Sequence, residues 1–269
     1  MKKIFAVVVV VASLAASSVA EGIVPVIDLR LGALLGGSRD GKWLEPGVAA
    51  ESIMTGPMDI WVYGLTGRER NAFPSARRGP VDEVCEDYFG INMYDERPRL
   101  AVGIGVNAKW KAMPRIPRRL SLNSATYKAA VIAMLKKEGI KRPVAKLTQA
   151  FAIDLEGDGT DEILITATNI KSKYGFRWDK GEYSFTMLRK VTKSGVKDYL
   201  VEGNFFKNAE DSGMAPNRFA ISGIADLNGD GKMEFVVFSE YYEGEGSGAY
   251  EMRGGKPELI KELQTGCGV

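Results

Sequence analysis

Short apolar segments, separated by turn-forming residues, dominate the chain and predict a fold that is mainly β. The segment 60–63 is aromatic and β-branched, and the segment 42–44 follows a glycine-rich turn, so both are expected to be strands. The polar segment 66–80 contains glycine and proline and is expected to form a long loop. Together these features predict a β-rich N-terminal domain at residues 21–115.

One segment, 123–138, has the periodicity of a helix. Asn123 or Ser124 can cap its N-terminus, and Gly139 can end it. Its apolar residues recur at helical spacing and are expected to pack against the core. They are Tyr127, Val131, Met134 and Leu135.

From residue 144 onward the chain repeats the order strand, acidic loop, strand, turn, strand, turn, strand. The first unit begins with AFAIDLEGDGTDEILITA at 150–167, and the second with ISGIADLNGDGKMEFVVFSE at 221–240. Repetition on this scale indicates stacked or radially arranged β units. We therefore expect a second domain at residues 116–269, in which the helix precedes two four-stranded antiparallel units that resemble β-propeller blades.

Each unit carries a nine-residue acidic loop, DLEGDGTDE at 154–162 and DLNGDGKME at 226–234. The loops align without gaps, with side-chain oxygens at positions 1, 3, 5 and 9 and glycine at position 6. Calcium takes about six to eight oxygen ligands, and this spacing is expected to converge them on one ion. The alternative is a turn between two strands that holds no metal. The expected ligands are Asp154, Glu156, Asp158, Thr160 and Glu162, then Asp226, Asn228, Asp230, Lys232 and Glu234, with Thr160 and Lys232 acting through their main-chain carbonyls.

The loops differ from an EF-hand, because Ile165 and Val237 stand where that motif carries a bidentate glutamate. The residues after each loop continue as a strand. This strand–loop–strand pattern resembles the calcium loops of FG-GAP or VCBS-type repeats, which occur in integrin-like β-propellers, and the resemblance covers roughly residues 146–263. It implies calcium as the cofactor. Only two copies are visible, whereas a closed propeller usually has about four or more blades.

The chain contains no histidine, which excludes Ser-His-Asp and Cys-His catalytic sites and zinc sites with histidine ligands. Oxygen ligands remain, and they favour hard cations such as calcium. Glu240 and Glu243 flank a pair of tyrosines, so a glycoside hydrolase that uses carboxylates is kept as an alternative.

The N-terminus has the pattern of a secretory signal peptide. Lys2 and Lys3 precede an apolar run at 4–16, which is too short to span a bilayer, and small residues follow up to Ala20. We expect residues 1–20 to be cleaved, and no later segment is apolar enough to span a membrane. The mature chain is then expected in a periplasm or outside the cell.

Removal of two lysines with this segment leaves basic residues equal in number to the 34 acidic ones. A neutral chain has no broad attraction to nucleic acid. Arg115, Arg118 and Arg119 form a small cluster in the proline-containing segment 111–122, which is interpreted as a solvated linker. Cys85 and Cys267 are the two cysteines, and in an oxidising compartment they can form a disulfide or remain free.

These patterns predict an exported, non-catalytic calcium-binding β-repeat protein. Its expected role is adhesion or the binding of a protein or glycan at the cell envelope. The alternatives are the hydrolase named above and a purely structural envelope protein.

Overall fold

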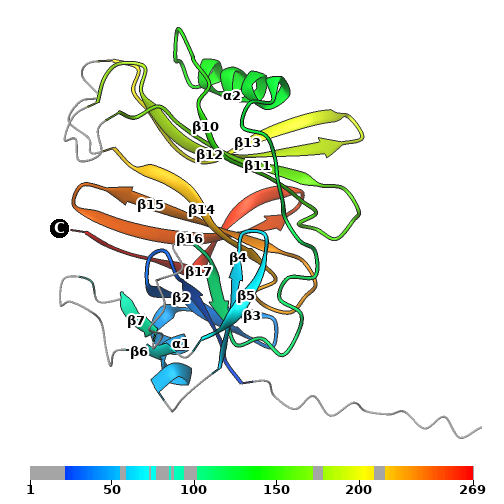
Figure 1. The fold of residues 1–269 in the computed structure, drawn as a ribbon, viewed down its shortest axis with the longest axis vertical. Helices are drawn as coiled ribbons and strands as arrows, with labels where there is room; N and C mark the ends of the chain where they lie inside the picture. Colours follow the sequence, from blue (N-terminus) through cyan, green and yellow to red (C-terminus); the bar gives the residue numbers. More distant parts are fainter. Residues whose placement is uncertain are drawn as a thin grey trace, which may run out of the picture.

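The computed structural model describes residues 22–54, 59–72, 74–76, 85, 88–93, 102–171, 178–208 and 216–268. This part of the chain forms three antiparallel sheets and two helices, and the sheets are stacked one above another (Figure 1). The expected signal peptide, residues 1–20, lies outside the described residues. Neither helix in the described part of the chain has the length and apolar character to cross a membrane.

The N-terminal sheet has the strand order β5-β4-β8-β1-β2-β7-β6, and β3 pairs with β2. Its strands are β1 (Val24–Asp28), β2 (Ala33–Arg39), β3 (Lys42–Leu44), β4 (Ile60–Gly64), β5 (Gly67–Ala72), β6 (Pro74–Ala76), β7 (Phe89–Met93) and β8 (Ile104–Val106). The strands predicted at 42–44 and 60–63 are confirmed. The loop predicted at 66–80 is wrong in part, because β5 and β6 occupy most of it. Among the described strands, β5 lies at the sheet edge and pairs with β4 alone. An edge strand needs no apolar sequence for its main-chain hydrogen bonds.

The two predicted four-stranded units are confirmed, and each is an antiparallel meander. In the first unit a short strand, β9, is added beside β10, so its sheet has five strands. The first unit contains β9 (Arg118–Arg119), β10 (Leu147–Ile153), β11 (Glu162–Thr168), β12 (Tyr183–Thr192) and β13 (Gly195–Phe205), and the second contains β14 (Arg218–Ala225), β15 (Glu234–Tyr241), β16 (Gly244–Arg253) and β17 (Lys256–Gly268). Each acidic loop joins the β10–β11 or β14–β15 strand pair.

The predicted helix is confirmed as α2 (Ala125–Lys137), with Ser124 at the N-cap, although its side chain makes no capping hydrogen bond. At the other end, the Gly139 N–H donates to the Lys136 carbonyl at 3.0 Å, and the Ile140 N–H donates to the Leu135 carbonyl at 2.9 Å. This pair of bonds is a Schellman motif, and the φ of Gly139 is +90°. The helix covers the outer face of the first unit (Figure 1).

A second helix, α1 (Pro46–Met54), was not predicted from the sequence. It is only nine residues long and begins with proline, which suits the first helical position. Its buried residues Ala49, Ala50 and Ile53 pack with Ile27 and Leu34 of the N-terminal sheet. The contact with this sheet, rather than a strong local periodicity, accounts for the helix.

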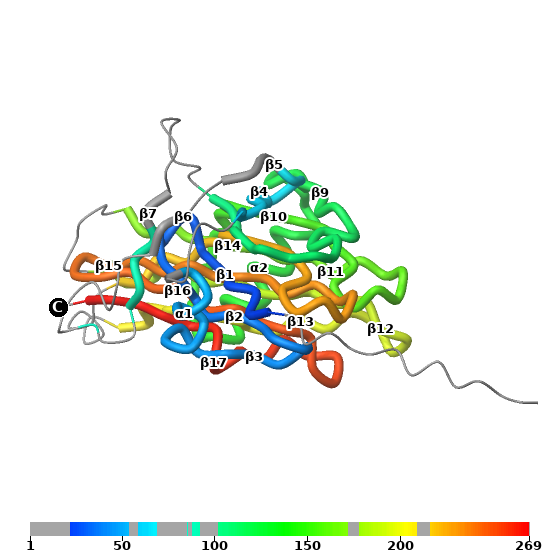
Figure 2. The backbone as a smooth tube through the Cα atoms, turned by 90° about the horizontal axis from the view of Figure 1, so that it is seen from below, coloured from blue at the N-terminus to red at the C-terminus, as the bar shows by residue number. Residues whose placement is uncertain are grey.

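One hydrophobic core joins all three sheets. It contains Val26 and Ile104 from the N-terminal sheet, Ile224 and Phe235 from the second unit, and Phe151 from the first. The last strand, β17, also lies beside β2 and β3 (Figure 2). The core therefore crosses the domain boundary expected near residue 115, and the division into two domains stays a prediction.

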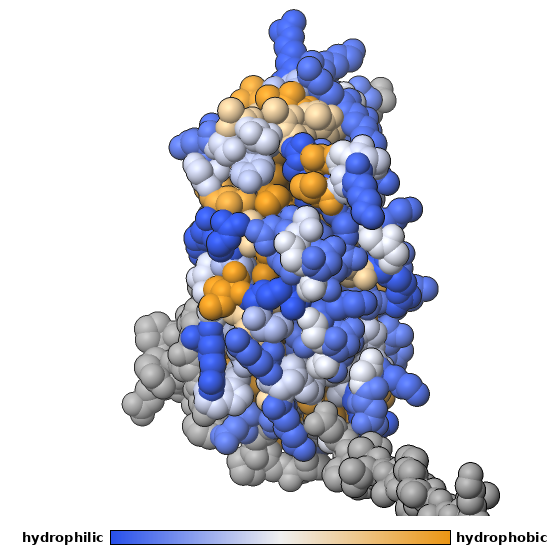
Figure 3. Space-filling view, turned by 90° about the vertical axis from the view of Figure 1, so that its right-hand side faces the viewer, coloured by the Kyte–Doolittle hydropathy of each residue, from blue (hydrophilic) through white to orange (hydrophobic). Residues whose placement is uncertain are grey.

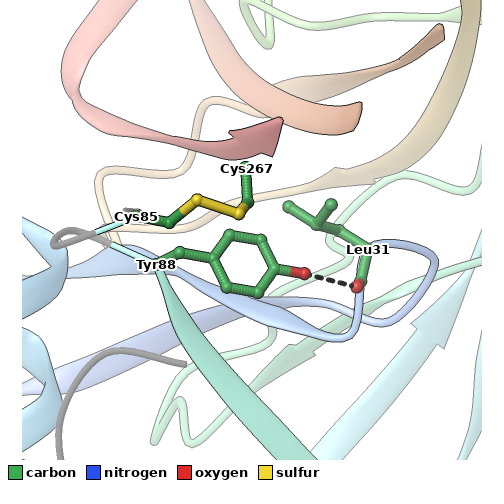
Figure 4. Close-up of a disulfide and its surroundings, with 4 residues drawn as sticks. All are labelled: Leu31, Cys85, Tyr88 and Cys267. Atoms are coloured by element: carbon green, nitrogen blue, oxygen red, sulfur yellow. Dashed lines mark hydrogen bonds between the residues drawn. A yellow bond between two sulfur atoms is a disulfide. The ribbon is translucent and has the colours of Figure 1, made fainter. Parts of the chain in front are cut away.

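A disulfide joins Cys85 to Cys267, with their Cα atoms 5.5 Å apart (Figure 4). It connects the end of β17 to the segment just before β7, across a sequence separation of 182 residues. Beside it, the Tyr88 hydroxyl donates a hydrogen bond to the Leu31 carbonyl at 3.1 Å. The C-terminal strand is therefore held covalently to the N-terminal sheet.

A buried carboxylate, Asp28, links the N-terminal sheet to the second unit. Its Oδ2 accepts hydrogen bonds from the Ser222 hydroxyl at 2.8 Å and from the Ser247 hydroxyl at 2.6 Å. Its Oδ1 accepts the Arg30 N–H at 2.8 Å. Burial nevertheless raises the pKa of Asp28, because loss of water outweighs these hydrogen bonds.

The face of the molecule shown in Figure 3 is mostly hydrophilic, and its apolar atoms gather in small groups, chiefly towards its upper end. The large exposed apolar side chains of the first unit include Val191 and Val196, which pair across the β12–β13 hairpin. Small groups of exposed apolar residues such as this pair are common on protein surfaces. This face therefore presents mainly polar chemistry to a partner.

Candidate metal centre

The two acidic loops lie next to each other in space. The Met233 N–H at the end of the second loop donates to the Leu155 carbonyl of the first loop at 2.8 Å. Arg115 bridges them, because its Nε donates to the Asp154 carbonyl at 2.5 Å and its Nη2 donates to the Gly231 carbonyl at 2.9 Å. The repeat thus brings its two candidate sites together at one end of the stacked sheets.

The interpretation of the arginine cluster as solvated charge holds for Arg118 and Arg119, which are exposed, but not for Arg115, which is half-buried. Besides the bridging Arg115, Arg118 forms an ion pair with Asp161 at 2.6 Å, and Arg119 lies over the ring of Phe151, 5.5 Å from its centroid. The physical reason is that residues 118 and 119 pair with β10 as the short strand β9, which places Arg119 opposite Phe151 and Arg118 opposite Ala152, near the first loop.

The two loops share one backbone conformation, which their glycines allow. Gly159 and Gly231 at position 6 have φ values of +84° and +82°, a left-handed conformation that glycine adopts at little cost. Gly157 and Gly229 at position 4 also have positive φ, at +75° and +82°. At position 2, Leu155 and Leu227 are fully buried and anchor the loops in the core.

In both loops the first aspartate accepts backbone N–H groups from positions 4 and 6. Asp226 accepts the Gly229 N–H at 2.7 Å on Oδ1 and the Gly231 N–H at 3.0 Å on Oδ2. Asp154 accepts the equivalent pair, from Gly157 and Gly159, at 2.7 and 2.9 Å. The carboxylate therefore sits inside the turn and holds its shape.

Positions 5 and 9 also match between the loops. At position 5, Asp158 and Asp230 each accept the N–H of position 7, from Thr160 and Lys232 respectively, at 2.8 Å. At position 9, Glu162 accepts the Leu155 N–H at 3.0 Å, and Glu234 accepts the Leu227 N–H at 2.8 Å. These bonds tie the end of each loop back to its beginning.

The loops differ at position 3. Asn228 Oδ1 accepts the Asp230 N–H at 3.0 Å and so supports its own loop. Glu156, the residue at the same position in the first loop, instead forms an ion pair with Lys190 on β12. The longer side chain of Glu156 reaches β12. The shorter side chain of Asn228 instead accepts a hydrogen bond within its own loop.

Burial and neighbouring charge raise the pKa of both position-9 glutamates. Burial raises the pKa of Glu162 to about 7, and the charges of Asp158 and Asp154 act in the same direction. Burial raises the pKa of Glu234 well above its usual value, and the charges of Asp230 and Asp226 add to this. A bound divalent cation would favour the ionised carboxylates and so lower the pKa of both glutamates.

Among the described residues, no three acidic or thiol side chains are gathered as closely as a metal-binding group requires. The carboxylates are turned onto the backbone N–H groups named above. A carboxylate oxygen that accepts one N–H retains a second lone pair. The second loop therefore offers three carboxylates and one amide oxygen, a donor set of the kind calcium prefers.

The acidic turn of the second unit has a different arrangement from the one considered in the sequence. Glu240 lies directly opposite Glu245 on the β15–β16 pair, whereas Glu243 is in the exposed turn. Burial raises the pKa of Glu245, and the charges of Glu240 and Asp28 add to the increase. An arginine, Arg30, lies 4.0 Å from Glu240.

A cavity of about 620 Å³ lies between the edge strand β13 and the second unit, and sequence reasoning did not identify it. Amide and hydroxyl groups from separate strands face it, and Tyr250 donates a hydrogen bond to Glu202 beside it. Three of its lining residues, Gly246, Ser247 and Gly248, come from the glycine-rich segment GEGSG at 244–248. The lining residues are Glu202, Asn204, Asn217, Phe219, Val237, Ser239, Gly246, Ser247, Gly248, Tyr250, Leu259, Gln264, Thr265 and Gly266.

Comparison with known proteins gives no match to a family model, to a curated protein or to a solved structure. The function is therefore argued from the chemistry of the loops and of the cavity.

Proposed function

We propose that the chain is an exported, non-catalytic calcium-binding β-repeat protein. The observation that carries the proposal is the second acidic loop, which places three carboxylates in one turn: the buried Asp226 and Glu234 at positions 1 and 9, and Asp230 at position 5. In the described part of the chain, no lysine or arginine lies within ion-pair distance of these three carboxylates. A divalent cation would supply the missing positive charge.

The residues that would hold calcium in this loop are Asp226, Asn228, Asp230 and Glu234, together with the main-chain carbonyl of Lys232. When bound, calcium supplies positive charge and links the turn to the first residue of β15. The resemblance to FG-GAP or VCBS-type loops supports this assignment. The role is then structural, since the ion would stiffen the β14–β15 connection.

Localisation and partner follow from separate features. The signal-peptide pattern at residues 1–20 and the disulfide between Cys85 and Cys267 support a periplasmic or secreted protein. The cavity beside β13 offers mainly amide and hydroxyl groups, which suit a neutral polyhydroxyl ligand. We therefore favour a glycan over a charged partner. Once residues 1–20 are removed, the chain has no net charge to attract nucleic acid.

The opposed pair of Glu240 and Glu245 favours the carboxylate hydrolase as the second candidate. Neither glutamate lines the cavity beside β13. Release of reducing sugar from a polysaccharide panel, lost in Glu240→Gln and Glu245→Gln, would establish this candidate, and no release would remove it.

Calcium binding is tested on the exported chain purified from a bacterial periplasm and treated with chelator. We expect calcium at about 10 mM to raise the melting temperature by several degrees, since saturation of a site at 100 times its Kd contributes about 2.7 kcal/mol. Asp230→Asn keeps the acceptor for the Lys232 N–H but removes a charge, so it should lose most of this shift. No calcium-dependent shift in the unaltered chain would refute the proposal.

A further inference from the structure

We infer that the repeat binds a single calcium ion, in the second loop, and that the ammonium of Lys190 neutralises the first loop from within. The inference rests on the proposed calcium function. It assigns different electrostatic roles to two loops that have the same spacing of oxygen-bearing residues.

Strand register places Lys190 and Glu251 at equivalent positions of the repeat. In the first unit Ile163 pairs with Arg189, so the next residues in the antiparallel register, Glu162 and Lys190, face each other. In the second unit Phe235 pairs with Tyr250, so Glu234 faces Glu251 in the same way. Both glutamates occupy position 9 of their loops, and therefore a cation in one unit corresponds to an anion in the other.

Lys190 is placed to act as the cation of the first loop. Its Nζ contacts Glu156 and lies 3.4 Å from Glu162 Oε1, and only 13% of its side chain is exposed. Glu156 Oε2 and Glu162 Oε1 are buried and accept no hydrogen bond, so the ammonium is what balances them among the described residues. The negative charges of Glu156 and Glu162 are therefore paired with Lys190 and are not left for a metal ion.

Further positive charge surrounds the first loop. Arg115 Nε lies 3.9 Å from Asp154 Oδ2, and Arg118 pairs with Asp161. A divalent ion entering this loop would meet the Lys190 ammonium and would have to displace it from two glutamates. The Lys190 ammonium would then be buried without its glutamate partners and would be repelled by the divalent ion.

Around the second loop, negative charge exceeds positive charge. Strand register places Glu251 opposite Glu234 and so adds a fourth carboxylate beside this loop. The cation beside Glu251 is Arg253, which is 68% exposed and is shared with Glu258. Exposed, shared pairs contribute little, so the loop keeps a net negative charge for an external ion.

The experiment is calcium titration calorimetry on the exported chain, combined with two matched variants that keep the loop hydrogen bonds. We expect one calcium per chain, retained in Asp158→Asn and weakened at least tenfold in Asp230→Asn. Two ions per chain, or loss of binding in Asp158→Asn, would overturn the inference and leave the calcium function standing. No binding at all would refute the calcium function itself.

Lys190→Met tests the lysine directly, because it keeps the apolar stem and removes the ammonium. This variant should bind two calcium ions, whereas the control Lys193→Met, at an exposed turn position, should still bind one. If Lys190→Met does not fold, Lys190→Gln replaces it. A folded Lys190 variant that still binds one ion would overturn the role assigned to this residue.

Discussion

Buried carboxylates set the electrostatic character of individual sites in this protein. Asp28, Glu162 and Glu234 are almost completely inaccessible to solvent, yet each has a different way of compensating its charge. Asp28 uses hydroxyl and backbone donors, Glu162 faces an ammonium, and Glu234 receives one backbone N–H and faces other acids. The three carboxylates have the same formal charge, but their different partners give each one a different electrostatic environment.

Asp28 predicts a pH dependence of stability. Its pKa is raised in the folded chain, so the native state binds a proton more tightly than the unfolded state does. The stabilising contribution is complete below the ordinary value of 3.8 and is lost as pH rises through the raised native pKa. Asp28→Asn removes this group while its amide can still bond Ser222 and Ser247.

We expect the free energy of unfolding of the unaltered chain, relative to Asp28→Asn, to fall as pH rises above about 4, by about 1.4 kcal/mol for each unit by which the native pKa is raised. Urea unfolding in chelator at a series of pH values measures the difference. Parallel pH profiles for the two proteins would contradict the assignment of a raised pKa to Asp28.

At the level of elements, local turn structures end α2 and the strands that flank the acidic loops. The acidic loops turn on glycines with positive φ, and α2 ends in a Schellman motif at Gly139. The termination of α2 matters for packing, because Ile140 just beyond it joins the core beneath the helix with Leu135 and Val131. A change at this glycine therefore affects both the turn and the apolar contact that follows it.

Gly139→Ala should destabilise the chain by about 1 kcal/mol, since alanine adopts a φ of +90° only with strain. The corresponding fall in melting temperature is about 2–4 °C. Gly47→Ala in α1 is the control, because the added methyl group meets nothing closer than 3.9 Å and the backbone has an ordinary φ. Equal melting temperatures for both variants would show that Gly139 does not need its left-handed conformation.

At the scale of the whole molecule, the second unit is the central layer. It shares its core with the N-terminal sheet, is joined to that sheet by Asp28, and is tied to it again through the disulfide at the end of β17. The first unit is connected through the same core and through Arg115 between the loops. The three sheets therefore support one another through contacts distant in sequence.

Removal of the disulfide should weaken this arrangement without changing the metal site. Closure of so long a loop is worth up to about 5 kcal/mol in the chain-entropy description, so Cys85→Ser with Cys267→Ser should lower the melting temperature by roughly 10 °C or more. The calcium stoichiometry should stay the same, because Cys267 pairs with Glu245 at the end of β16 remote from Glu251. Free thiols in the exported chain, detected by mass spectrometry, would contradict the bridge.

Local sequence patterns predicted much of the architecture correctly. The helix, the two meanders and the turn glycines follow from periodicities and conformational preferences that act within a few residues. Sequence patterns failed for α1 and β5, because a short helix on a sheet and a polar edge strand depend on their neighbours. They also missed the pairing of Glu240 with Glu245 and the cavity beside β13, which depend on strand register and sheet packing.

The sequence by itself determined that the chain is mainly β, that its second half is duplicated, and that each copy carries the same acidic turn. Those properties come from residues that are close along the chain. Only the tertiary structure decided that Lys190 faces one loop and Glu251 the other, that Arg115 bridges the loops, and that Cys85 meets Cys267. The reason is physical: charges and thiols interact through space, and the positions of distant residues are defined only once the strands have paired and the sheets have packed.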